Sequence, residues 1–255
     1  MATLIDALPL IGTLRNAVFL SATVSEIEQL TPRMRRIRFG GPRLRGLTWT
    51  PGQQIGLQVA GIGVSGLRLH PLGVVRTYSI HDADPDAGTL DIAMLDHAGD
   101  LNTVSPAKQW ASAISIGDQV RMTRPQGTFV IRHDAPYHVF AGEETASVAF
   151  AAMLRKLPPT AEVHGVIEGA TRADHLPLAR PLTQVERGDT PAADSAVLTE
   201  ALRALRLPDH PGVAYLAGEA RTIQAARRIL ITERGWDRRN IHTKPFWTPG
   251  RRGME

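Results

Sequence analysis

The feature that most constrains this chain is a change of sequence rhythm near Pro136. Before it, short segments alternate apolar and polar residues and are separated by turn signals such as Pro51-Gly52. That pattern predicts a small antiparallel barrel or sandwich. After it, apolar strands alternate with segments of helical spacing, which predicts a parallel sheet covered by helices. We therefore expect two domains, residues 17–133 and residues 134–255.

The expected elements follow from the apolar positions and the turn residues. In the first half, the alternating segments predict strands over Gln54–Val59, Leu90–Leu95, Val120–Met122 and Phe129–Ile131. In the second half, strands are expected over Tyr137–Ala141, Glu162–Ile167, Gly212–Gly218 and Asn240–Trp247. Helices are expected over Glu144–Leu157, after Asp194 as an N-cap, and around Ile223–Leu230 with Gly235 at the C-terminal end.

The composition is that of a globular protein, with 43% hydrophobic and 21% charged residues. No apolar run approaches the roughly 20 residues of a membrane span, so we expect no integral membrane segment. Met1–Leu14 is apolar, but Asp6 interrupts it and no basic residues precede it. We interpret this segment as a mature N-terminal arm or short helix rather than a signal peptide, which makes the cytoplasm the expected location.

The chain has no cysteine, which excludes disulfides, iron–sulfur clusters and thiol redox chemistry. Any redox activity must therefore rest on a bound organic cofactor. The net charge is +4, yet aromatic residues make up only 5% and no basic run is interleaved with them. This argues against nucleic acid as a partner. An anionic cofactor or substrate accounts for the same charge.

Two apparent motifs do not meet their structural requirements. Gly61-x-Gly63-x-x-Gly66 matches a dinucleotide fingerprint, but the short segment that follows it ends at a proline and cannot form the required helix. We expect a loop between strands there. Asp82-x-Asp84-x-Asp86 resembles the start of a calcium loop but lacks its glycine and glutamate, so we expect a polar hairpin turn. The scattered histidines predict no metal site.

The most informative segment is Arg76-Thr77-Tyr78-Ser79, which we place on a strand that enters a loop. Strand alternation puts Arg76 and Tyr78 on one side and the two hydroxyl residues on the other. An arginine can neutralise a pyrophosphate with a bidentate fork, and a tyrosine offers a flat face on which a ring can stack. The alternative is an ordinary strand with one exposed arginine and one half-buried tyrosine.

The motifs that follow in order give this segment its context. They are the strand that leads to His97, Pro106-Ala107-x-x-Trp110-Ala111, Gly117-Asp118 and Pro125-x-Gly127. With the segment at Arg76 they resemble the FAD-binding domain of the siderophore-interacting family, a branch of the ferredoxin-reductase-like flavoproteins. The second half agrees through Gly142–Ala146, Ala217–Ala220 and Phe246-Trp247-x-x-Gly250-Arg251. The resemblance implies an antiparallel Greek-key β-barrel FAD domain followed by a Rossmann-like parallel-sheet NAD(P)H domain.

The resemblance also implies site residues, with Tyr78 and Ser79 nearest the isoalloxazine and no catalytic residue beyond the flavin. The implied FAD contacts are Arg76, Thr77, Tyr78, Ser79, Ala93, Met94, Leu95, Asp96, His97, Ser105, Ala107, Lys108, Phe246 and Trp247. The implied NAD(P)H contacts are Gly142, Thr145, Gly218 and Glu219. For Phe246 and Trp247, core packing is the alternative. The carboxylates at 143, 144 and 219 have the alternative role of stabilising helix N-termini.

The activity that the resemblance implies is electron transfer from NADPH or NADH through FAD to iron(III) in a siderophore, which releases iron(II). Lys244, Arg251 and Arg252 are the expected substrate contacts, because the arginines frequent in the family's closing motif are absent at 248 and 249. The sequence does not decide whether NADPH or NADH is the electron donor. Two alternatives also stay open: a flavin-dependent reductase that feeds a protein acceptor, and a non-catalytic module that binds flavin or siderophore, with docking to an uptake transporter.

Overall fold

The computed structural model describes residues 19–60, 63–65, 68–70, 74–96 and 106–250, and it divides into two compact units. The first unit ends at Gln126 and the second begins at Gly127, except that Gln29–Met34 belongs to the second. The division at 133/134 expected from the sequence lies a few residues further along the chain and stays a prediction. The predicted N-terminal arm, Met1–Leu14, lies outside the described residues.

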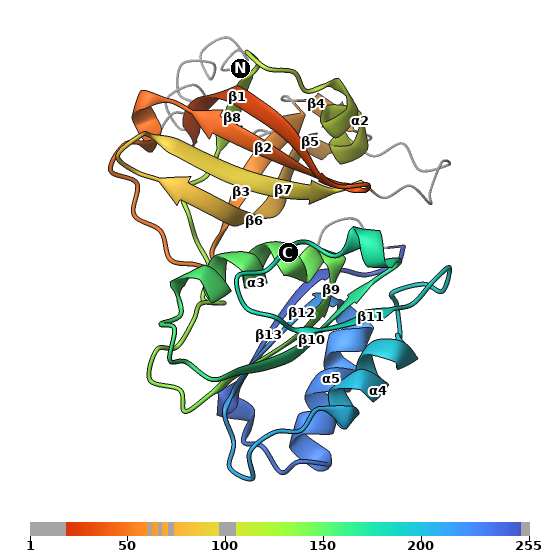
Figure 1. Cartoon of the computed structure of the whole chain (residues 1–255). Coiled ribbons are helices and arrows are strands. Elements are labelled where there is room, and N and C mark those ends of the chain that lie inside the picture. The colour runs from red at the N-terminus through yellow and green to blue at the C-terminus, as the bar shows by residue number, and fades with distance from the viewer. Residues whose placement is uncertain (1–18, 61–62, 66–67, 71–73, 97–105, 251–255) are drawn as a thin grey trace, which may run out of the picture. The chain divides into compact units, whose positions relative to one another are not determined.

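Six antiparallel strands close into a barrel in the first half of the chain, in the order β1-β2-β7-β6-β3-β8 (Figure 1). Their bounds are β1 Leu20–Thr31, β2 Met34–Gly40, β3 Gln54–Ala60, β6 Val74–Asp84, β7 Thr89–Leu95 and β8 Gln119–Met122. β2 lies beside β7 rather than β3, which is a Greek-key connection. Closure leaves these strands without an open edge. The fold class expected for the first half is confirmed, with a barrel in place of the sandwich alternative.

The barrel core follows from the period-2 alternation of its strands. Ile55 and Leu57 of β3 face inward with Leu90 and Ile92 of β7, and all four are fully buried. The shorter elements that accompany the barrel are the helical turn η1 (Pro42–Leu44), the hairpin β4 (Gly63–Ser65) with β5 (Arg68–His70), and helix α2 (Pro106–Ala113). The hairpin replaces the loop expected after Gly61, and no helix is described there. The rejection of the dinucleotide motif is therefore confirmed for the described residues.

A parallel sheet of five strands forms the second half, in the order β11-β10-β9-β12-β13. The strands are β9 His138–Glu143, β10 Val163–Gly169, β11 Thr183–Glu186, β12 Val213–Glu219 and β13 Ile241–Trp247. Helix α3 (Glu144–Lys156) covers one face, while α4 (Ala196–Ala204) and α5 (Ala220–Thr232) cover the other (Figure 1). Two helical turns, η2 (Arg172–Asp174) and η3 (Arg238–Asn240), complete the unit. The expected parallel sheet with helices is confirmed.

Among the differences between the structure and the predicted elements, three concern the second unit. Phe129 and Ile131 form no strand; both side chains are buried in the hydrophobic core of the second unit instead. Strand β11 was not predicted, because its residues are mostly exposed and give no apolar pattern. The N-cap of α4 is Ser195 rather than Asp194, since the Ser195 hydroxyl accepts a hydrogen bond from the Leu198 N–H.

No helix among the described residues is long and apolar enough to cross a membrane.

Candidate functional site

The motif that begins at Arg76 lies on a strand, as the sequence predicted, near the start of β6. In the antiparallel register with β3, Arg76 lies opposite Leu57 and Tyr78 lies opposite Ile55. Both β3 residues point into the barrel core, so Arg76 and Tyr78 share the inward side of β6. Thr77 points away from that side and is exposed. The predicted alternation is confirmed.

Arg76 is a half-buried cation, and most of its guanidinium donors have no partner among the described residues. Its Nη1 donates to the Val75 carbonyl at 2.9 Å, and it forms no ion pair with any described residue. Tyr78 is half-buried and packs against the barrel core. Burial raises the pKa of Tyr78 to about 12, with Arg76 acting in the opposite direction, so the phenol stays neutral. A neutral ring beside an arginine with spare donors fits an aromatic cofactor that carries phosphate.

The other predicted barrel residues lie on β7 and α2. Ala93 and Met94 are buried, Leu95 is half-buried, and Asp96 is exposed just after the strand. β7 pairs antiparallel with β6 through Ile92 opposite Ile80, so the end of β7 and the start of β6 lie at the same end of this hairpin. Ala107 and Lys108 lie in the first turn of α2, which begins at Pro106. His97 and Ser105 lie outside the described residues.

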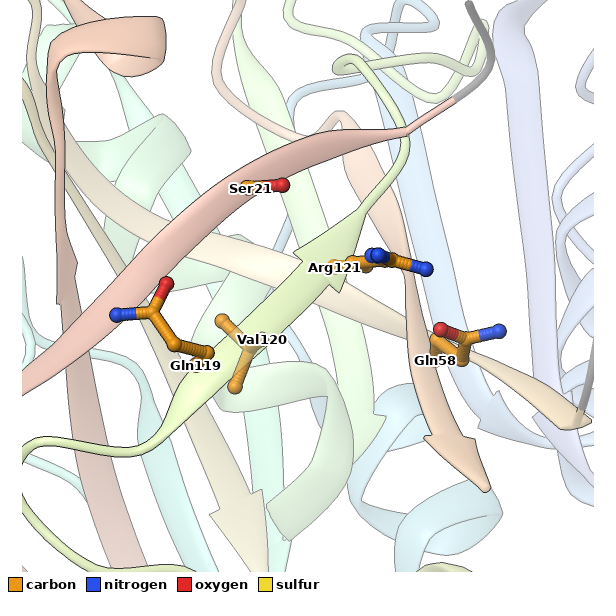
Figure 2. Close-up of a pocket in the computed structure, with 5 residues that line it drawn as sticks. All are labelled: Ser21, Gln58, Gln119, Val120 and Arg121. Atoms are coloured by element: carbon orange, nitrogen blue, oxygen red, sulfur yellow. The ribbon is translucent and has the colours of Figure 1, made fainter. Parts of the chain in front are cut away.

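A hollow of about 510 Å³ opens on the barrel wall (Figure 2). Its lining residues are Ser21, Gln58, Gln119, Val120 and Arg121. They come from β1, β3 and β8, whereas the predicted flavin contacts on barrel strands lie on β6 and β7. None of them was predicted as a site residue, because residues on three strands far apart in the sequence form the hollow.

Three neighbouring strands of the parallel sheet carry a glutamate at or next to their carboxyl ends. Glu143 ends β9, Glu168 is the penultimate residue of β10, and Glu219 ends β12. All three side chains are buried, and Glu168 lies directly opposite Glu143 in the register. The strand order reverses between β9 and β12, and ligands of open α/β sheets bind beside such a switch point. The three carboxylates therefore gather where a nucleotide is expected.

Two of these three carboxylates, Glu143 and Glu219, have a structural role as helix N-caps. Glu143 is the N-cap of α3, where its Oε2 accepts the Thr145 N–H at 2.8 Å and its Oε1 accepts the Thr145 hydroxyl. Glu219 caps α5 by accepting the N–H groups of Arg221 and Thr222, each at 2.9 Å. The expectation that carboxylates stabilise these helix N-termini is confirmed. The cofactor roles of Thr145 and Glu219 stay predictions.

The two predicted glycines also have structural reasons. A Cβ at Gly142 would lie 2.3 Å from the carbonyl oxygen of Ala217, so β9 and β12 require glycine there. Gly218 has φ +128°, and a Cβ on it would lie 2.8 Å from Oε1 of Glu143. Close packing of the protein on itself explains both positions, and their contact with a nucleotide stays a prediction.

A network of charges next to Glu143 was missed by the sequence analysis. Glu144 accepts from Arg187 at 2.7 and 2.8 Å and from Arg33 at 2.6 Å. Burial alone would raise the pKa of Glu144, but the bonds from Arg187 hold it below its usual value. Glu168 accepts the Ser195 hydroxyl and lies 3.5 Å from Arg187, and burial raises its pKa. The partners are 111 residues apart for Arg33 and 43 for Arg187, so no local pattern shows them.

One sequence signal could have located Glu168. Each of β9, β10 and β12 is an apolar run that reaches an acidic residue near its end. The carboxyl ends of parallel strands meet at one edge of the sheet, so these acids must cluster. No group of three or more Asp, Glu, His or Cys within the described ranges is arranged to hold a metal ion.

The last strand, β13, carries three predicted residues with different surroundings. Phe246 packs partly against the core of the second unit, as the packing alternative holds. Trp247 is half-buried and donates from Nε1 to Oε1 of Glu143 at 2.9 Å. Lys244 is half-buried, forms no ion pair with a described residue, and has its pKa lowered by burial. Arg251 and Arg252 lie outside the described residues.

Comparison with known proteins matches both halves to one family. Residues 23–129 match the siderophore-interacting FAD-binding domain, and residues 135–250 match the siderophore-interacting protein model. The chain belongs to the siderophore-interacting protein family. The first half of this siderophore-interacting protein is thus an FAD-binding domain, and it holds the Arg76 motif on β6 of its barrel.

Individual relatives agree with this assignment. The ferric vibriobactin reductase ViuB of Vibrio cholerae is 27% identical over 182 residues, which cover 70% of this chain and 66% of that protein, just under two thirds. A siderophore utilization protein from T. fusca superimposes with a TM-score of 0.78 at 25% identity, over 93% of this chain and 95% of that one. The ferredoxin reductase of carbazole 1,9a-dioxygenase has a TM-score of 0.64 at 19% identity, over 90% of this chain and 66% of that one. The last similarity shows that the fold is ferredoxin-reductase-like.

Proposed function

We propose that this siderophore-interacting protein is an FAD-dependent reductase of ferric siderophores that takes its electrons from NADPH or NADH. The observation that carries the proposal is that both halves match the family in order. FAD supplies the conversion of a two-electron hydride donor into single-electron transfers to iron(III). Hard oxygen ligands hold iron(II) less tightly than iron(III), so reduction releases the metal. The chain itself has to bind, orient and shield these groups.

Arg76 and Tyr78 support the flavin part of the proposal. Arg76 has spare guanidinium donors for a pyrophosphate, and Tyr78 keeps a neutral ring beside it. In this proposal Ser79 and the end of β7 line the isoalloxazine, and Thr77 with the first turn of α2 lies toward the rest of the cofactor. In this proposal Phe246 and Trp247 of β13 are further contacts of the flavin.

The buried carboxylates shape the proposed nucleotide contact. Glu143 and Glu219 occupy N–H groups at two helix N-termini, which could otherwise bind a phosphate. A phosphate beside them would face uncompensated repulsion. We therefore place the uncharged reduced nicotinamide ring, and not the pyrophosphate, at the edge formed by Gly142 and Gly218.

The proposed substrate contacts are Lys244 and two arginines that follow it, Arg251 and Arg252. Lys244 is a half-buried lysine without a carboxylate partner among the described residues, so it can meet an anionic ferric chelate. Arg251 and Arg252 follow it along the chain and complete the basic group in this proposal. Because NADPH and NADH are cytoplasmic donors, we place the reaction in the cytoplasm.

An anaerobic visible spectrum tests the proposal. The purified protein is loaded with FAD, then NADPH or NADH is added, and then a ferric siderophore. We expect the flavin absorbance to bleach with one of the nucleotides, which identifies the donor, and to recover when the chelate is added. A protein that takes up no FAD, or flavin that neither nucleotide bleaches, would falsify the reductase. Recovery with a protein acceptor but with no iron chelate would favour the alternative of a protein-coupled reductase.

Arg76→Ala gives the matched residue test. Loss of a charge-assisted bidentate contact should weaken FAD binding about 10- to 100-fold. Arg43→Ala is the control, because Arg43 is an exposed arginine of η1 in the same unit. Equal FAD affinity in the two variants would remove Arg76 from the proposed site.

A further inference from the structure

Glu143 lies where four segments of the second unit meet. It ends β9, caps α3 through Thr145, and accepts a hydrogen bond from Trp247 at the end of β13. Its carboxylate also fills the space beside Gly218 of β12, where a Cβ would come within 2.8 Å of Oε1. Only 2% of Glu143 is exposed. The local shape of β9, α3, β12 and β13 is therefore built around one carboxylate.

Capping alone does not require this residue. Aspartate, asparagine, serine and threonine are the preferred N-caps, and each could satisfy the Thr145 N–H. Glutamate has one more methylene, which lets Oε1 reach the indole of a residue 104 positions away. Glu219 provides an internal comparison, because it caps α5 with the same residue type and is also almost completely buried. Its Oε1 has no hydrogen-bond partner among the described residues, whereas Oε1 of Glu143 holds Trp247.

The charge of Glu143 changes within the physiological pH range. Burial and the neighbouring charge of Glu144 raise the pKa of Glu143 to about 7, against the opposing hydrogen bonds from Thr145 and Trp247. Arg187 is a cation that interacts electrostatically with Glu143, and it donates hydrogen bonds directly to Glu144. The residues of β13 and β12 that lie against the Glu143 carboxylate are Trp247 and Gly218, and neither carries a charge. An indole N–H binds a carboxylate more strongly than a neutral carboxylic acid, so the Trp247 contact is firm only when Glu143 is ionised.

We propose that Glu143 is a positioning residue that holds the indole of Trp247, and with it the end of β13, in the orientation that flavin reduction requires. The inference rests on the proposed function, in which Trp247 approaches the flavin. Above neutral pH the carboxylate fixes the indole. Below neutral pH this hydrogen bond to the indole weakens.

The first test follows Trp247 directly. Its fluorescence is obtained as the difference between the FAD-loaded protein and its Trp247→Phe variant, from pH 5.5 to 8.5. We expect this signal to change with a midpoint near pH 7, and to lose that change in Glu143→Gln. Glu143→Asp keeps a good N-cap but is too short to reach the indole, so it should fold and lack the Trp247 transition. Glu219→Gln is the matched control and should keep the midpoint.

The second test is functional. Single-turnover flavin reduction by the nicotinamide nucleotide is timed by stopped flow over the same pH range. At pH 8 we expect reduction about tenfold slower in Glu143→Asp than in the unmodified protein, since one charge-assisted hydrogen bond is lost. The dependence on pH around 7 should vanish in Glu143→Gln.

The outcomes separate this inference from the proposed function. If the nucleotide bleaches the flavin while the Trp247 signal is the same in the unmodified protein, Glu143→Asp and Glu143→Gln, the inference is wrong and the reductase stands. If the Trp247 signal follows Glu143 but neither nucleotide reduces the flavin, the reductase is wrong, and with it the catalytic meaning of the contact.

Discussion

Asp91 in the barrel and Glu143 in the parallel sheet are both almost completely buried carboxylates, but the chain compensates their charges differently. Asp91 accepts three hydrogen bonds at 2.8 Å from two arginines of β2, Arg36 and Arg38. Among the described residues, Glu143 accepts only from an amide, a hydroxyl and an indole. Burial would raise the pKa of both; the arginines bring that of Asp91 below its usual value, while that of Glu143 rises to about 7. One carboxylate is permanently charged and the other changes charge near neutral pH.

The difference separates a structural charge from one available for function. A carboxylate that two cations hold stays ionised above its lowered pKa, and removing it leaves those cations without their partner, which is costly. A buried carboxylate held by neutral donors is costly in its charged form, and such groups cluster at functional sites. Glu168 resembles Glu143, because its pKa is also raised by burial and its main partner is the Ser195 hydroxyl. Glu143 and Glu168 therefore differ in kind from Asp91, whereas Glu144, which Arg187 and Arg33 hold, resembles Asp91.

The largest expected effect is the loss of Asp91. Asp91→Ala leaves Arg36 and Arg38 without their buried partner, and we expect it to reduce the free energy of unfolding by about 3 kcal/mol at pH 7. Urea denaturation measures the change. Asp91 has a lowered pKa, so its contribution exists above its unfolded pKa and is lost as pH falls through the folded one. The difference from the unmodified protein should therefore shrink in strong acid.

Glu28→Ala is the control for Asp91. Glu28 also pairs with Arg36, at 2.6 Å, but its side chain is 50% exposed. Exposed ion pairs contribute about 0.2–1 kcal/mol, so this variant should lose little. Equal losses in the two variants would show that burial does not distinguish Asp91, and the comparison with Glu143 would fail.

Much of the fold was predictable from the sequence because its information is local. Alternation in β3 and β7, and the apolar run of β12, each identify a strand without knowledge of its partners. Phe129 and Ile131 show the limit, since their alternation reflects burial in the core of the second unit and not pairing with another strand. Apolar spacing reports which side chains are buried, and a strand is only one way to bury them.

The site was less predictable because its chemistry depends on distant partners. Arg38 is 53 residues from Asp91, and Trp247 is 104 residues from Glu143. The sequence showed the carboxylate at 143 and its capping role, but not the indole that it holds. The motif at Arg76 was found through its spacing and the resemblance to the family. Its shared face with Tyr78 followed from strand alternation alone.

A second prediction sharpens the comparison through the pH dependence of stability. Glu143 has a folded pKa of about 7 against a usual value of 4.5, so the folded protein keeps a proton that the unfolded chain releases. Its contribution to stability is full below about pH 4.5 and is lost as pH rises through 7. Glu143→Gln cannot titrate. Between pH 5 and pH 8, its free energy of unfolding should rise relative to that of the unmodified protein by about 2 kcal/mol. Urea denaturation at both pH values measures this change.

A constant difference between the two proteins across this range would mean that Glu143 is ionised throughout, as Asp91 is. The contrast between the barrel and the sheet would then disappear. The opposite pH slopes of Asp91 and Glu143 are thus a direct measure of that contrast.

The smallest expected effect concerns Ser195, which donates to Glu168 and caps α4. Ser195→Ala should cost about 1 kcal/mol from the lost cap, as read from urea denaturation. The hydroxyl also opposes the effect of burial on Glu168, so its loss should raise the pKa of Glu168 further. The ionised form then lacks a donor, which makes the variant more costly at pH 8 than at pH 5.

Ser115→Ala is the control, since Ser115 is exposed and its hydroxyl makes only a 3.4 Å contact with a carbonyl. It should change stability little at either pH. If Ser195→Ala lowers the free energy of unfolding equally at pH 5 and pH 8, the only role of Ser195 is to cap the helix. Glu168 would then be compensated mainly by Arg187, 3.5 Å away, and would resemble Asp91 more than Glu143. If the loss of free energy of unfolding instead grows with pH, Glu168 resembles Glu143. Neutral hydrogen-bond donors then stabilise its charge, whereas arginines stabilise the charge of Asp91 in the barrel.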